Sequence, residues 1–190
     1  IRRRTADYFV DLVRLCADMG GTFMVIGSPK QRNLLPGITR ERALGYAEEV
    51  YGRALPEAER CGVTLAIEPL SPSDTDFLRT GDDGIELIKR LNHPRFRLHL
   101  DVKAMSGSET DPIPAVIRRS APYLHHFHAN DPNLLGPGMG AVDHRPIMKA
   151  LKEAGYKGWL SVEVFNYAPG PEFIARQSID YLRRVDAMTG

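Results

Sequence analysis

The chain has 190 residues, 43% of them hydrophobic, which is enough for one domain with a buried core. Its 25 Lys and Arg residues nearly balance its 24 Asp and Glu residues, so charge gives no reason to expect nucleic acid or an anionic membrane as a partner. Its apolar runs are only as long as strands, well short of the ~20 residues that span a bilayer. Cys16 and Cys61 have neither metal-site spacing nor the density of a disulfide scaffold, so we expect free thiols in a reducing cytoplasm.

Helices and strands are predicted to alternate along the whole chain. The segment 5–19 has apolar residues at helical spacing and ends at two glycines, and residues 22–27 form an apolar run typical of a strand. A helix over 39–60 follows, in which Pro56 should kink or split the helix, and then a strand over 63–68. The later predicted elements are helix 82–91, strand 96–101, helix 113–120, strand 123–128, helix 144–154, strand 159–163 and helix 171–188.

This alternation is typical of a parallel sheet covered by helices. An open doubly wound sheet also fits the pattern. A complete (βα)8 barrel typically needs ~250 residues, so five units would leave a barrel open, and about three units are expected upstream. We therefore predict an α/β fold in which residues 1–190 form a single barrel domain that is N-terminally incomplete.

Side-chain alternation predicts where the chemistry lies. In strand 63–68 the aliphatic residues share one face and Glu68 lies on the other, and the same reasoning puts Asp101 and Glu163 on the inward face at the ends of their strands. A fourth strand ends in His128. Any one of these residues alone is equally well explained as a helix cap or a packed core residue. Four of them in phase, at the strand ends where barrels place catalytic groups, favour a functional site.

Crowded buried carboxylates repel one another unless a cation neutralises them. Three carboxylates and one imidazole suit a hard or borderline divalent metal. We therefore predict that Glu68, Asp101, His128 and Glu163 bind one divalent ion, with Mn²⁺ as the first candidate and Mg²⁺ or Co²⁺ as alternatives.

Five stretches carry a family resemblance: Ala66–Leu70, Leu98–Val102, His126–Asp131, Gly136–Gly140 and Gly158–Val164. As an ordered set they resemble strands four to eight of the xylose isomerase-like TIM barrel superfamily of sugar isomerases and epimerases, with ketose 3-epimerases and hydroxypyruvate isomerases as close models. The resemblance implies the same four metal ligands. It also implies that Glu68 and Glu163 transfer protons through an enediolate of a small sugar or hydroxy-keto substrate.

Three departures from the resembled pattern concern substrate binding rather than the metal. Ala104 stands where the epimerases have a histidine, Leu134 where they have an arginine, and Asp74 where they have a glutamate. The substrate is therefore less certain than the reaction type. The substrate-binding candidates are Asp74, Lys103, Asn130 and Asp131, and a loop or turn role is an equally good explanation for each of them.

Other functions stay open at this point. A metal-dependent dehydratase of the inosose type shares the proton abstraction. An endonuclease-IV-like hydrolase is disfavoured because Ala104 replaces a metal-binding histidine and the net charge does not suit DNA. A non-catalytic fragment, or completion by a partner chain, is the third alternative. The sequence does not set the sugar or the oligomeric state, and a homo-oligomer is compatible with it.

Overall fold

The computed structural model describes residues 1–190, in which five strands form one parallel sheet. The strands follow chain order across the sheet: β1 (Phe23–Ile26), β2 (Thr64–Ile67), β3 (Phe96–Asp101), β4 (Leu124–Ala129) and β5 (Leu160–Val162). Each strand pairs with the next in sequence, which is the order of a barrel wall rather than of a doubly wound sheet. β1 and β5 are the two edges. The sheet is therefore part of a barrel, as predicted.

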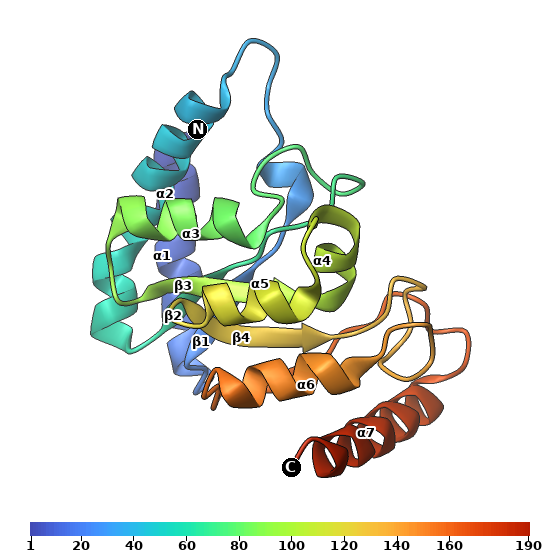
Figure 1. The fold of residues 1–190 in the computed structure, drawn as a ribbon. Coiled ribbons are helices and arrows are strands. Elements are labelled where there is room, and N and C mark those ends of the chain that lie inside the picture. Colours follow the sequence, from blue (N-terminus) through green and yellow to red (C-terminus); the bar gives the residue numbers. More distant parts are fainter.

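The helices follow the sheet on its outer side and contact their sequence neighbours, with α1 and α7 at the two ends of the series (Figure 1). They are α1 (Arg2–Asp18), α2 (Arg40–Cys61), α3 (Gly81–Leu91), α4 (Val102–Ser108), α5 (Ile113–Ser120), α6 (His144–Glu153) and α7 (Pro171–Met188), with a short 3-10 helix, η1, at Pro29–Gln31. No helix combines the length and the apolarity that a membrane crossing requires.

The aliphatic face of the sheet packs on these helices. Leu65, Ile67, Leu98 and Leu100 are almost completely buried within one hydrophobic core. Gly84 of α3 approaches this face so closely that a Cβ atom there would lie 2.6 Å from Leu98 Cδ1. The opposite face of the same strands carries polar side chains, so the predicted alternation is confirmed for β2 and β3.

Two helices differ from the sequence prediction. Pro56 does not split α2, which runs unbroken from Arg40 to Cys61. Buried residues on both sides of the proline, among them Ala54 and Ala58, hold the two halves against the core, and this packing outweighs the lost hydrogen bond. The segment 102–108, predicted as a loop, forms α4 because the Asp101 carboxylate caps it by accepting a hydrogen bond from the Ala104 N–H at 2.8 Å.

Candidate functional site

The four predicted metal ligands come from the carboxyl ends of four successive strands, β2 to β5. His128 is central, because its Nδ1 lies 3.5 Å from Asp101 Oδ2 and 3.2 Å from Glu163 Oε2. Potential ligand atoms of Glu68, Asp101 and His128 all lie within 4.8 Å of one another, in a group that also includes His99. The structure therefore brings the four predicted side chains into one cluster.

Burial and charge make this cluster suited to a cation. Glu68 is 6% exposed and Asp101 is 3% exposed. Burial, and then the nearby Asp101 carboxylate, raise the pKa of Glu68 to about 8. Burial alone would lower the pKa of His128, but its contacts with Asp101 and Glu163 raise that pKa to about 9.

One buried polar atom of this cluster has no hydrogen bond. His128 Nδ1 faces two carboxylates, yet it makes no hydrogen bond of good geometry. One divalent cation would neutralise the carboxylates and use this nitrogen as a ligand. The donor set of oxygens and imidazole therefore fits a hard or borderline divalent metal.

Asn130, a predicted substrate-binding residue, holds Asp101 in position. Its Nδ2 donates a hydrogen bond of 2.6 Å to Asp101 Oδ2, and its Oδ1 accepts one of 2.8 Å from the Lys103 N–H. Because the other Asp101 oxygen accepts from Ala104, both oxygens of this carboxylate are fixed by residues around the end of β3 and the start of α4. Contact with a substrate stays a prediction for Asn130.

Asp74 and Lys103 form an ion pair, with Lys103 Nζ 3.0 Å from Asp74 Oδ2. The Asp74 carboxylate also accepts a hydrogen bond of 2.7 Å from the Ser71 hydroxyl, and the Lys103 ammonium lies 5.2 Å from the centre of the Phe165 ring. The pair thus joins the loop after β2 to the first turn of α4, near the segment that follows Glu163. The sequence marked both residues as candidates but gave no sign that they contact each other.

Asp131 is placed differently from the other candidates. Its carboxylate accepts a hydrogen bond of 3.0 Å from the Val142 N–H and is 2% exposed. A Cβ atom at Gly140 would lie 2.1 Å from the same carboxylate, so this glycine is required for the close approach. The contacts of Asp131 are those of a residue that fastens the loop 133–142, and a substrate role for it stays a prediction.

Two residues at the cluster were missed from the sequence. His99 is fully buried, with its Nε2 3.5 Å from Glu68 Oε1, and the alternation that selected Asp101 places His99 on the same face. Arg32 comes from the loop after β1 and donates from Nη2 to the Glu68 carbonyl oxygen at 2.7 Å. Burial lowers the pKa of this guanidinium. No periodic pattern marks residues in that loop, so the sequence offered no signal for Arg32.

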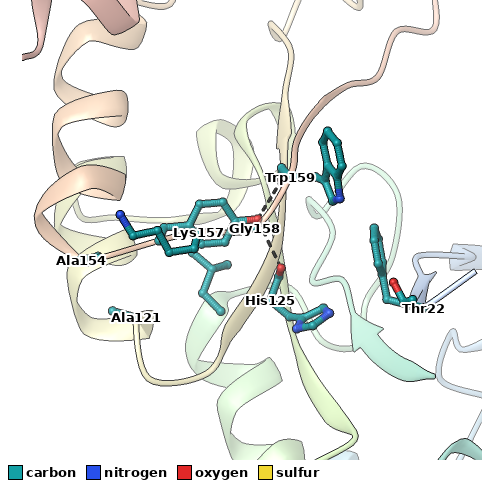
Figure 2. A pocket seen from close by; sticks show the side chains of 11 residues that line it. Thr22, Ala121, His125, Ala154, Lys157, Gly158 and Trp159 are labelled. Atoms are coloured by element: carbon teal, nitrogen blue, oxygen red, sulfur yellow. Dashed lines mark hydrogen bonds between the residues drawn. The ribbon is translucent and has the colours of Figure 1, made fainter. Parts of the chain in front are cut away.

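A separate pocket lies at the opposite, amino-terminal end of the strands. Figure 2 shows Thr22, His125 and Trp159 around it, and these residues lie just before or at the starts of β1, β4 and β5. The Tyr156 hydroxyl closes one wall by donating to the Trp159 carbonyl oxygen at 2.8 Å. None of the predicted site residues lines this pocket. In barrel folds this end of the sheet serves stability rather than catalysis.

The chain is similar to known proteins over most of its length. The family model described as xylose isomerase-like TIM barrel matches residues 1–185. The chain is 32% identical over 108 residues to the D-psicose 3-epimerase of Ruminiclostridium cellulolyticum, which covers 57% of this chain and 36% of that protein. It is 27% identical over 156 residues to the ketose 3-epimerase of Arthrobacter globiformis, and the aligned residues make up 81% of this chain and 53% of that protein.

The fold comparison gives the same result. A solved structure of an L-ribulose 3-epimerase superposes with a TM-score of 0.86 over 98% of this chain and 68% of that one, at 21% identity. At this identity the superposition establishes the fold alone. The chain spans from about a third to about half of the length of the two curated relatives described above.

Proposed function

The chain belongs to the xylose isomerase-like TIM barrel family, and from this membership we propose that residues 1–190 are about the last five βα units of a single eight-unit barrel domain. We further propose that the intact protein is a divalent-metal-dependent isomerase or epimerase of a sugar or a small hydroxy-keto compound. The names of the relatives, a D-psicose and a ketose 3-epimerase, support a ketose as the first substrate class to test.

The observation that carries the proposal is the convergence of the four strand-end side chains. Asn130 orients Asp101, and His128 lies between the Asp101 and Glu163 carboxylates. Glu68 belongs to the same group as Asp101 and His128. These four residues are the proposed ligands of one ion, with Mn²⁺ as the first candidate and Co²⁺ or Mg²⁺ as alternatives. When bound, such an ion polarises a carbonyl group and stabilises negative charge on its oxygen.

The two glutamates are proposed to carry the proton transfers. One removes the proton from the carbon next to the substrate carbonyl, which leaves an enediolate, and the other returns a proton. Return to the same carbon on its opposite face gives epimerisation, whereas return to the neighbouring carbon gives isomerisation. Glu68 is buried beside His99, and the Glu163 side chain is about one-third exposed, so the two carboxylates have different surroundings.

Substrate contacts are proposed for the residues around this cluster. Lys103 and Asp74 place opposite charges beside the Phe165 ring, an arrangement that combines hydrogen-bonding groups with an apolar surface. Asn130 and Asp131 are weaker candidates, because the hydrogen bonds described above already use their side chains.

The test is exchange of solvent deuterium, measured by NMR on the full-length protein with added Mn²⁺. The substrate panel is D-fructose, D-psicose, L-ribulose and a hydroxy-keto acid. We expect deuterium to enter the carbon next to the carbonyl, and both Glu68→Gln and Glu163→Gln to abolish this exchange. Glu153→Gln, on the exposed side of α6, is the matched control and should exchange normally. Loss of water from a polyol-derived ketone without epimerisation would instead indicate the dehydratase, and unchanged exchange in both glutamate variants refutes the proposed roles.

A further inference from the structure

His99 is a buried imidazole whose two ring nitrogens make no hydrogen bond of good geometry. It lies on β3, two residues before Asp101 and on the same face of the sheet, and its exposed fraction is 0%. Buried polar groups are nearly always paired, so an unpaired ring requires an explanation such as an ion or an ordered water molecule.

The ring of His99 lies against the proposed metal ligands. Its Nε2 is 3.5 Å from Glu68 Oε1, and its ring centre is 4.1 Å from that of His128, with the two planes at 70°. His99, Glu68, Asp101 and His128 each offer a ligand atom within 4.8 Å of the other three. A His99 nitrogen therefore lies in the same group of potential ligand atoms as three of the four predicted ligands.

A second buried histidine provides a contrast. His126 is the partner of His99 in the register of β3 and β4 and also faces inward, with its ring centre 5.2 Å from that of His99. Its ring, however, lies 4.5 Å from the Phe23 ring, and it is absent from the group that contains the carboxylates. His126 does form a second group with His99 and His128 alone. Both groups contain His99 and His128, but only the second contains His126. Loss of metal binding on replacing His126 would therefore indicate the three-histidine group.

We propose that His99 is a fifth protein ligand of the divalent ion, in addition to Glu68, Asp101, His128 and Glu163. This inference rests on the proposed function, because it adds a ligand to the same ion. A second imidazole shifts the preference of a site away from Mg²⁺ and towards Co²⁺ and later divalent transition metals. The alternative is a positioning role, in which His99 only donates a hydrogen bond to Glu68.

The experiment compares the full-length protein with its His99→Leu and His126→Leu variants. Both substitutions remove a buried inward imidazole from neighbouring positions of the sheet and replace it with a side chain of similar volume. Circular dichroism checks that each variant is folded. The affinities for Co²⁺ and Mg²⁺ are measured by calorimetric titration, and X-ray absorption of the Co²⁺-loaded proteins counts the imidazole ligands.

We expect two imidazole ligands in the unsubstituted protein and in His126→Leu, and one in His99→Leu. We also expect His99→Leu to weaken Co²⁺ binding by about 100-fold or more, since even residues that only support a ligand contribute about 10- to 100-fold. Mg²⁺ binding should weaken less than Co²⁺ binding. If the unsubstituted protein and His99→Leu have the same number of imidazole ligands, the inference is overturned in favour of the positioning role. If His126→Leu loses as much affinity as His99→Leu, a three-histidine site is correct instead. If the unsubstituted protein binds no divalent ion, the proposed function itself fails.

Discussion

Replacing Gly27 with alanine should disable the metal cluster without unfolding the protein. Gly27 follows β1, and a Cβ atom there would lie 1.8 Å from Glu68 Oε2 and 3.0 Å from Glu68 Cδ. An ordinary contact begins at 3.4 Å, so this oxygen must retreat by about 1.6 Å. Because Glu68 is 6% exposed and lies beside His99, Asp101 and His128, that retreat displaces its carboxylate from the position it holds in the cluster.

The size of the effect follows from this displacement. A misplacement of about 1 Å at a reacting group can cost ~100-fold in rate, so we expect losses of at least that order in deuterium exchange and a clear loss of Mn²⁺ affinity. The clashing atom is the end of a flexible side chain, so the free energy of unfolding should change by less than about 1 kcal/mol. Gly27 has no positive φ angle, which means that alanine adds no backbone strain there.

Gly45→Ala is the matched control. Gly45 lies within α2, and a Cβ atom there would meet nothing within 4 Å. This variant should leave Mn²⁺ binding unchanged and stabilise the helix by roughly 0.5–1 kcal/mol. Calorimetric Mn²⁺ titration and urea unfolding of both variants provide the measurements. If Gly27→Ala binds Mn²⁺ as tightly as the unsubstituted protein, the position assigned to the Glu68 carboxylate is wrong.

Two further predictions concern the fold. Leu98→Ala removes a fully buried side chain between β3 and α3 and should lower the free energy of unfolding by ~2–5 kcal/mol in urea; a change below 1 kcal/mol would contradict the packing described. Burial would raise the pKa of Asp83, but hydrogen bonds from the backbone N–H groups of Arg79 and Thr80 and from Arg40 hold it below its usual value. Its stabilising effect is therefore complete above the ordinary carboxyl pKa and is lost as the pH falls through the lower, folded-state value. Asp83→Asn should cost about 1 kcal/mol at pH 7 and progressively less in acid, and a pH-independent cost would refute this assignment.

The alternation of side chains made most of the fold predictable. All five strands and six of the seven α-helices lie where periodicity placed them, because a half-buried strand or helix records its packing directly in its sequence. α4 was missed because it is only seven residues long; a helix cap was one explanation considered for Asp101, but no periodic pattern marked a helix after it. Pro56 does not split α2, since this local preference gave way to packing on both sides of it, and a kink at Pro56 stays a prediction.

The candidate site also contains residues that the sequence predicted and residues that it did not. Glu68, Asp101, His128 and Glu163 were predictable because each follows from its phase at a strand end, and His99 carries the same signal two residues earlier in its strand. Side chains from loops, and contacts between residues far apart in the sequence, leave no periodic pattern of apolar and polar residues. Arg32 and the pairing of Lys103 with Asp74 across 29 positions therefore became visible only in three dimensions.

Two positions that depart from the resembled pattern have clear surroundings in the structure. Ala104 is buried in the first turn of α4, where its N–H serves Asp101, so no polar side chain reaches outward from that position. Leu134 has a φ of 71°, which leucine rarely adopts, yet the loop keeps this conformation with the Leu134 N–H bonded to the Asp131 carbonyl oxygen at 2.9 Å. At both positions the backbone N–H is bonded near a predicted site residue, while the side chain itself is apolar. In the proposed enzyme, metal binding and substrate choice depend on different residues, and Lys103, the partner of Asp74 in the ion pair, is the neighbour of Ala104 in α4.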